Sequence, residues 1–307
     1  MKKIICIFWI LLLLLTACND ADISIKATPD PSEGDKNISY ELSLLSNDSQ
    51  RVNLTELHQE EREIKLNLQL IYRGDDPSKV RIFMIGDRML QKFAVGENNT
   101  AFWYDLTLQN EKAEKIPIAL TPETVKTKIH YYHFIMVDNI KDDQVTQNNR
   151  LYLKNSVLAS ISYQVKCGER CKYVTKKSDH GTLIDLPSYL EKRSLSELTI
   201  IGYENKDSDD ILALKNNIKA PDGNTEILLR SFCTGECTVF LFIDGEPCYL
   251  ENGWSVDFFG KERKYFETRI PSSILPNRTG TTAFAVFICD EEEEEIVKIT
   301  NKIIFHK

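Results

Sequence analysis

The stretch Ile64-Lys-Leu-Asn-Leu-Gln-Leu-Ile-Tyr72 decides the fold class, because its apolar side chains alternate with polar ones. Leu66, Leu68 and Leu70 share one face of an extended chain, whereas a helix brings side chains together at a spacing of about 3.6 residues. The period of two recurs at Phe284-Ala-Val-Phe-Ile288. These stretches are therefore predicted to be half-buried β-strands.

Turn-forming residues separate the predicted strands. Gly74-Asp-Asp-Pro77, Ile85-Gly-Asp87 and Asp244-Gly-Glu-Pro247 carry the residue types that tight turns require. Aromatic and β-branched residues concentrate between such turns, for example at residues 131–137 and 239–243. Strands joined by short turns over roughly 110 residues are typical of a β-sandwich.

The chain matches itself at a nearly constant offset. Val80-Arg-Ile-Phe-Met-Ile-Gly-Asp87 aligns with Thr238-Val-Phe-Leu-Phe-Ile-Asp-Gly245 at an offset of about 158 residues. Further blocks match in the same order: residues 47–52 with 206–211, 64–72 with 224–232, 116–117 with 270–271, and 133–138 with 285–290. A repeat in a fixed order predicts one domain present twice.

The first residues have the pattern of an export signal. Met1-Lys2-Lys3 is basic, an apolar run of about 12 residues follows, and Leu15-Thr-Ala-Cys18 ends it. A membrane-spanning helix needs about 20 apolar residues, so a permanent span is disfavoured. Leu15-Thr-Ala-Cys18 resembles the lipobox of bacterial lipoproteins, which implies a diacylglycerol thioether on Cys18 and a lipid-anchored protein exposed outside the cytoplasm, on the cell membrane or the outer membrane. The alternative is an ordinary signal peptide with an incidental cysteine.

A second resemblance concerns the fold. Phe266-Glu-Thr-Arg-Ile-Pro-Ser-Ser-Ile-Leu275, Thr279-Gly280, Phe284-Ala-Val-Phe-Ile-Cys-Asp290 and Val239-Phe-Leu-Phe-Ile-Asp-Gly-Glu-Pro247 are similar to bacterial immunoglobulin-like domains, over about 50 residues of the second repeat and more weakly in the first. The expected fold is all-β, with two tandem immunoglobulin-like sandwiches.

The expected organisation has five parts. Residues 1–17 are the signal peptide, 18–37 a polar tether, 38–166 the first sandwich, 167–196 a linker and 197–307 the second sandwich. Within the linker, Leu186-Pro-Ser-Tyr-Leu-Glu-Lys-Arg-Ser-Leu195 favours a short helix, because proline is tolerated in a first turn.

Charge and motifs exclude several functions. The formal charge of −8 becomes −10 when Lys2 and Lys3 leave with the signal peptide, which disfavours nucleic-acid binding. The chain contains no Gly-Xaa-Ser-Xaa-Gly elbow, zinc-protease helix, phosphate-binding loop or dinucleotide fingerprint. We therefore expect that the protein is not an enzyme and has no cofactor. The alternative is a catalytic dyad formed by carboxylates that are distant in the sequence.

Six cysteines remain after Cys6 and Cys18, and an oxidising compartment favours disulfides over zinc. Each of two pairs spans a three-residue loop, so pairing costs little loop-closure entropy: Cys167 with Cys171, and Cys233 with Cys237. In an immunoglobulin-type strand order, Cys248 and Cys289 lie about 20 Å apart, beyond the reach of a disulfide. They are predicted to stay unpaired with each other. The alternative joins Cys289 to one cysteine of the Cys233–Cys237 loop.

Two further patterns are candidate metal sites. His130 and His133 lie three apart on a predicted strand, so one should point inward and the other outward, which argues against joint ligation. Loops predicted at one end of each sandwich carry acidic residues that are candidate calcium ligands: Asp75, Asp76, Asp138, Asp142, Asp143 and Asp290. The alternative is a solvated loop end whose charges keep strands apart.

The sequence thus predicts a lipid-anchored envelope protein with a binding, adhesion or structural-spacer role. We expect the membrane and an envelope or extracellular protein as partners. Alternatives are a ligand-capturing lipoprotein, which needs an apolar or aromatic-lined cavity between domains, and an accessory subunit of an envelope enzyme, which needs a cluster of perturbed titratable groups.

Overall fold

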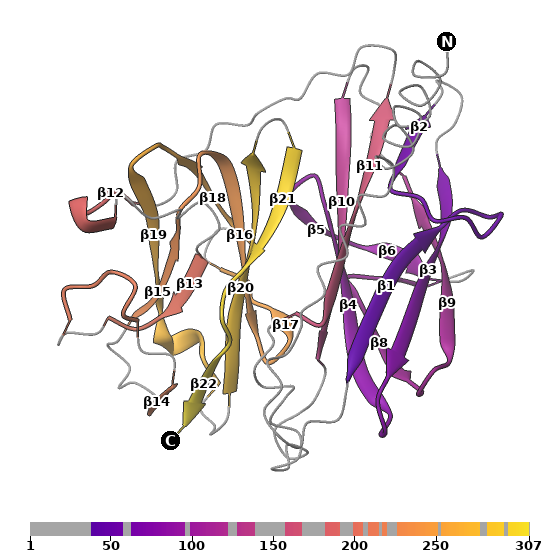
Figure 1. The fold of residues 1–307 in the computed structure, drawn as a ribbon, viewed down its shortest axis with the longest axis horizontal. Helices are drawn as coiled ribbons and strands as arrows, with labels where there is room; N and C mark the ends of the chain where they lie inside the picture. Colours follow the sequence, from indigo (N-terminus) through magenta and orange to yellow (C-terminus); the bar gives the residue numbers. More distant parts are fainter. Residues whose placement is uncertain are drawn as a thin grey trace, which may run out of the picture. The chain divides into compact units, whose positions relative to one another are not determined.

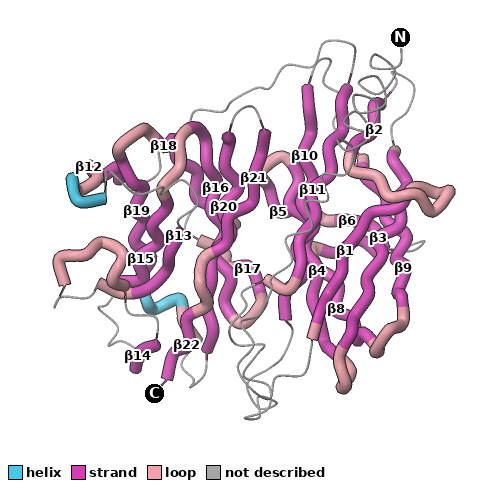
Figure 2. The backbone as a smooth tube through the Cα atoms, viewed as in Figure 1, coloured by secondary structure: helices cyan, strands magenta, loops and turns pink. Residues whose placement is uncertain are grey.

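The computed structural model is built almost entirely of β-strands (Figures 1 and 2). All residues that it describes belong to one compact unit, residues 31–307. The described residues are 38–57, 63–95, 99–121, 128–138, 157–167, 182–190, 199–204, 208–214, 217–219, 226–250, 253–276, 281–291 and 294–306. Among them, the helical segments are two short 3-10 helices, η3 (Ser188–Leu190) and η4 (Ser272–Ile274).

Two sheets form the first sandwich, coloured indigo to magenta in Figure 1. One sheet has the order β1 (Ser39–Leu45), β3 (Ile64–Arg73), β9 (Ala113–Leu120), β6 (Phe93–Val95) and β7 (Asn99–Ala101). The facing sheet has the order β2 (Leu54–Leu57), β11 (Ala159–Cys167), β10 (Lys128–Asp138), β4 (Ser78–Gly86) and β5 (Met89–Gln91), with β8 (Trp103–Leu108) also paired to β4.

The second sandwich also has two sheets. One has the order β12 (Thr182–Asp185), β19 (Lys264–Pro271), β15 (Glu226–Ser231) and β13 (Thr199–Gly202). The other has the order β14 (Asn217–Lys219), β22 (Ile303–His306), β20 (Thr281–Glu291), β16 (Gly235–Ile243) and β17 (Glu246–Pro247), with β18 (Val256–Gly260) on β16 and β21 (Glu294–Ile299) on β20.

The two sandwiches share one topology. In each sandwich, one sheet places a strand between an earlier and a later strand of the chain. In the first sandwich β3 lies between β1 and β9, and in the second β15 lies between β13 and β19. The pair β4 and β10 corresponds to β16 and β20. Even the parallel edge strands correspond, because β2 pairs with β11 as β14 pairs with β22. This immunoglobulin-like order in both halves confirms the predicted repeat and the all-β sandwich class.

Alternating burial gives each sandwich its core. Along β3, Leu66, Leu68, Leu70 and Tyr72 are buried, and the residues between them are half-buried. They join apolar residues of β4, β9, β10 and β11 in one cluster, and a separate cluster fills the second sandwich. The period of two therefore placed the inner face of these strands correctly.

Strands β4 and β16 do not alternate, because both of their faces are covered. Every residue from Val80 to Gly86 and from Glu236 to Ile243 is buried. A third apolar cluster packs β4, β5 and β10 of one sandwich against β16 and β20 of the other. At its centre, the rings of Phe83 and Phe242 lie 5.0 Å apart at 63°. Burial on both faces explains the continuous apolar runs in these strands.

The contacts across this layer are reciprocal. The turn after β4 meets the start of β16, where Arg88 Nη1 lies 3.2 Å from Glu236 Oε2. The turn after β16 meets the start of β4, where Arg81 Nη1 lies 2.9 Å from Glu246 Oε1. Strands β4 and β16 thus run in opposite directions across the layer, as equivalent elements do in a two-fold dimer.

Two expectations about local structure are corrected. His130 and His133 do point to opposite faces of β10, yet both are fully buried, because the outer face of this sheet is covered too. In the predicted linker, β12 pairs with β19, so part of this segment belongs to the second sandwich. In the described part of the predicted helix, Ser188–Leu190 form a single 3-10 turn, and residues 191–198 lie outside the described residues.

The apolar layer predicts a strong effect of one substitution. Phe242→Ala removes a fully buried ring and should lower the free energy of unfolding by about 3–5 kcal/mol. Met89→Ala is the control, because the Met89 side chain is 53% exposed and its loss should cost less than about 0.5 kcal/mol. Urea unfolding followed by circular dichroism measures both values. Equal losses would show that the layer is not packed as described.

Candidate functional site

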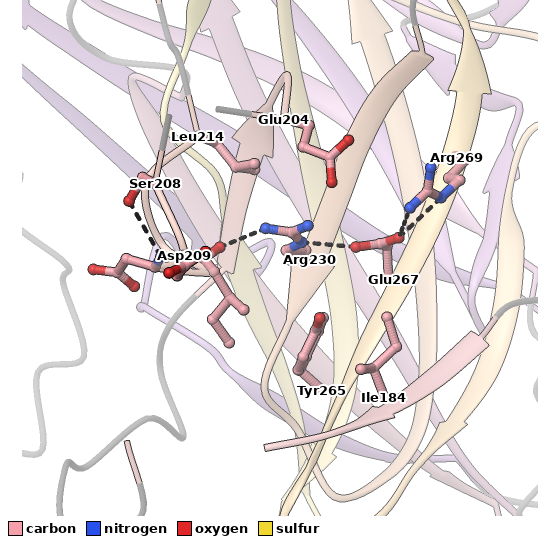
Figure 3. Close-up of a pocket in the computed structure, with 12 residues that line it drawn as sticks. Ile184, Glu204, Ser208, Asp209, Leu214, Arg230, Tyr265, Glu267 and Arg269 are labelled. Atoms are coloured by element: carbon pink, nitrogen blue, oxygen red, sulfur yellow. Dashed lines mark hydrogen bonds and ion pairs between the residues drawn. The ribbon is translucent and has the colours of Figure 1, made fainter. Parts of the chain in front are cut away.

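A polar pocket of about 320 Å³ lies on the sheet that contains β15 and β19, and Figure 3 shows its lining. Two strands provide its floor, and the segment 208–214 provides a wall. The lining residues are Ile184, Glu204, Ser208, Asp209, Asp210, Ile211, Ala213, Leu214, Arg230, Tyr265, Glu267 and Arg269.

Strand geometry places the charged groups of the floor together. Tyr265, Glu267 and Arg269 alternate along β19, so they share a face, while Phe266 and Ile270 point into the core. Arg230 on β15 is the register partner of Glu267. Its Nε donates a hydrogen bond to Glu267 Oε2 at 2.8 Å. A cross-strand ion pair thus forms the centre of the pocket.

The floor is a connected network of charges. Arg230 Nη1 donates to the Ile211 carbonyl oxygen at 2.6 Å, which ties the wall to the floor. Arg269 Nη2 lies 2.8 Å from Glu267 Oε1, and its Nη1 lies 3.2 Å from Glu226 Oε2. The hydrogen bonds that Arg269 donates to the carboxylates of Glu226 and Glu267 raise the pKa of its guanidinium group. Burial raises the pKa of the Tyr265 phenol. Both groups therefore stay protonated at neutral pH.

The lining carries four carboxylates and two guanidinium groups. Glu267 is engaged by both arginines, and Asp210 accepts hydrogen bonds from the Tyr189 hydroxyl and the Leu212 backbone amide. Glu204 and Asp209 are exposed at the edge of the pocket. The excess of negative charge favours a polar, positively charged group over an apolar or anionic one.

Sequence reasoning did not identify this pocket. The available signal was a charged residue inside an apolar strand, as in Leu228-Leu-Arg-Ser231 and Tyr265-Phe-Glu-Thr268. Buried arginine and glutamate are rare unless they are paired. Their pairing depended on the register of β15 with β19, which the sequence alone did not provide.

The cysteine prediction is wrong in one pair. Cys237 forms a disulfide with Cys289, its register partner on β20, and their Cα atoms lie 4.2 Å apart. The predicted Cys233–Cys237 bond is therefore replaced by the alternative, in which Cys289 bonds to a cysteine of the adjacent loop. A bond across two strands closes a 52-residue loop, which stabilises the fold by about 4 kcal/mol in the chain-entropy model.

The other predicted cysteine sites stay predictions. Cys18 and Cys171 lie outside the described residues, and Cys167 is described by its backbone alone. Cys248 is not bonded to Cys289, as predicted, and burial raises the pKa of its thiol.

The calcium candidates are not brought together in the described part of the chain. Asp75 and Asp76 lie in the turn before β4, and Asp138 ends β10 opposite Val80. Asp290 lies near the end of β20, against Arg88. Among described residues, the one group of three with ligand atoms within 4.8 Å of one another is Cys233, Cys237 and Cys289. Asp142 and Asp143 lie outside the described residues.

A buried ionic cluster joins the sandwiches, and we call its members, Arg88, His133, Glu236, Asp290 and Glu295, the Arg88 cluster. Arg88 Nε donates to Glu295 Oε1 at 3.0 Å, and Nη1 donates to Glu236 Oε2 at 3.2 Å. Arg88 Nη2 also contacts Asp290 Oδ1. His133 Nε2 lies 3.1 Å from Glu295 Oε2. Arg88 thus offsets part of the negative charge of three carboxylates that would be costly to bury alone.

The comparisons with known proteins add little to this geometry. No family model and no curated protein matches the chain. Among solved structures, the N-terminal domain of PorA aligns at 9% identity and a TM-score of 0.26, over 43% of this chain and all of that one.

Two alignments with adhesins are longer. A 1.5-MDa bacterial ice-binding adhesin aligns at 8% identity and a TM-score of 0.20, over 88% of this chain and 65% of that one. A chaperone-tip adhesin complex of CFA/I fimbriae aligns at 9% identity and a TM-score of 0.23, over 86% and 99%. Alignments of this quality carry no information about function.

The Arg88 cluster predicts a pH dependence of stability. Burial and the neighbouring Glu295 raise the pKa of Asp290 from 3.8 to about 7. Because the pKa is raised in the folded state, the contribution of this group to stability is complete below pH 4 and is lost as the pH rises through about 7. Wild-type stability should therefore fall between about pH 4 and pH 7 more steeply than that of Asp290→Asn.

Thermal unfolding at several pH values tests this prediction. Asp48→Asn, which changes an exposed aspartate, is the control and should keep the wild-type pH profile. A profile of Asp290→Asn parallel to the wild type would contradict the raised pKa.

Proposed function

We propose that the protein is a lipid-anchored binding protein of the bacterial cell envelope, with a binding role rather than a catalytic one. The pocket around Arg230 is the observation that carries the binding role, because it combines a cavity with a fixed network of polar groups (Figure 3). The anchor rests on the lipobox at Leu15-Thr-Ala-Cys18. In the described part of the chain, no helix has the length and apolar character needed to cross a bilayer.

The charge of the pocket indicates the chemistry of its partner. Glu204 and Asp209 leave the lining with an excess of negative charge, so we propose that a lysine or arginine side chain of an envelope or extracellular protein enters it. The pocket lies within the second sandwich, not between the domains, and its lining is polar. It therefore fits a protein partner better than the apolar ligand expected of a ligand-capturing lipoprotein.

A structural-spacer role is a second candidate, supported by the layer between the sandwiches. Apolar packing at Phe83 and Phe242, together with the ion pairs of Arg81 and Arg88, opposes bending between the two halves. A stiff block would hold the pocket at a fixed position relative to the first sandwich. The two roles are compatible.

Removal of the lipidated residue tests the anchor. Cys18→Ala should release the protein from membranes or leave it as an unprocessed precursor, because Cys18 would supply the only sulfur that the lipoprotein pathway can modify. Cys6→Ala, which changes the other cysteine of the signal peptide, is the control and should leave a mature, membrane-bound protein. Fractionation with mass measurement distinguishes the forms. A mature, membrane-bound Cys18→Ala protein would refute lipidation at this residue.

Charge removal tests the pocket. The double variant Glu204→Gln with Asp209→Asn should bind a lysine-rich peptide about tenfold more weakly than the wild type, since exposed ion pairs contribute up to about 1 kcal/mol each. Calorimetric titration at low and at physiological salt measures the affinity, and added salt should reduce the difference. Glu262→Gln, at an exposed position outside the pocket, should bind like the wild type. Equal affinity of the double variant would exclude the pocket as the site.

A further inference from the structure

Three buried cysteine sulfurs meet at one end of the second sandwich. Cys237 and Cys289 form the disulfide between β16 and β20. Cys233, in the segment that leads into β16, is not part of this disulfide, and its Sγ lies 3.1 Å from Cys237 Sγ. All three sulfurs lie within 4.8 Å of one another. Cys237 thus has two possible partners within reach, one of them bonded.

We propose that this group is a thiol–disulfide exchange centre, in which Cys237 alternates between Cys289 and Cys233. The thiolate of Cys233 attacks Cys237 Sγ, a bond forms between these two sulfurs, and the Cys237–Cys289 bond breaks. Cys289 leaves as a thiolate and takes up the proton that Cys233 lost. The number of disulfides is unchanged, so the step needs neither an oxidant nor a reductant.

Burial supports an internal exchange. The three residues are 6%, 1% and 0% exposed, so a dissolved thiol has little access to the disulfide, whereas Cys233 is already beside it. The two states differ in the loop that they close, 52 residues for Cys237–Cys289 against four for Cys233–Cys237. Closure of the longer loop restrains the unfolded chain more, so the Cys237–Cys289 state is more stable against unfolding than the Cys233–Cys237 state.

The exchange acts on the contact between the sandwiches. Glu236 precedes Cys237 on β16, and Asp290 follows Cys289 on β20. Both carboxylates hold Arg88, so the disulfide ties together the two strands that present them. Moving the bond to Cys233 leaves β16 and β20 joined by hydrogen bonds alone at this point, and the Arg88 cluster loses its covalent support.

Variants that permit only one bond test the proposal, and Cys248→Ser in every protein removes a further thiol. Cys289→Ser should contain a Cys233–Cys237 disulfide, and Cys233→Ser should retain Cys237–Cys289. Acid-quenched samples are denatured, alkylated at low pH and mapped as non-reduced peptides. With all three cysteines present, thiols should appear at Cys289 as well as at Cys233, and the Cys289 signal should be lost in Cys233→Ser.

Two results would overturn the proposal. One is a Cys289→Ser protein in which Cys233 and Cys237 both remain thiols. The other is a three-cysteine protein, equilibrated at pH 8, whose thiol is found at Cys233 alone. The second measurement decides the question even when Cys289→Ser fails to fold.

Discussion

Burial of β4 and β10 against β16 and β20 joins two sandwiches that each have their own core. An outer sheet face normally meets water, and here four strands present apolar side chains on both faces. This contact buries His133 and requires Arg88 to be paired with carboxylates. It also requires the turns after β4 and β16 to fit against the other sandwich. At Gly245, with a φ of +71°, an added Cβ would lie 2.9 Å from the Asp138 carbonyl oxygen. Side-chain size at this turn is therefore limited by the other half of the chain.

The Arg88 cluster and the cysteine group occupy opposite faces of the same strand ends. Side chains alternate along β16 and β20, so Cys237 and Cys289 point into the core while Glu236 and Asp290 point toward Arg88. The Cys237–Cys289 disulfide thus holds together the two strand ends whose opposite face carries the carboxylates that bind Arg88. The pocket around Arg230 lies on the other sheet of the same sandwich and has no residue in common with either group.

Local patterns were sufficient for the strands and the repeat, and insufficient for the sites. The alternation at Leu66, Leu68 and Leu70 predicts a strand with one buried face, and the burial of these three side chains confirms it. The disulfide was misassigned because loop-closure entropy favours Cys233–Cys237, whereas the register of β16 with β20 brings Cys237 to face Cys289. The pairing of Arg230 with Glu267 and the contacts of Arg88 across 148 to 207 residues likewise depend on register and packing. No local spacing encodes these contacts.

The reciprocal layer also bears on how the chain folds during synthesis. The first repeat leaves the ribosome before its counterpart exists, and until then Phe83, Ile85 and Ile135 face water. A nascent chain in this state can also pair with a neighbouring copy, because that copy presents the same apolar strand face or its equivalent from the second repeat. Correct pairing within one chain therefore competes with pairing between chains. The covalent connection through residues 167–196 raises the local concentration of the right partner and gives the intramolecular product its advantage.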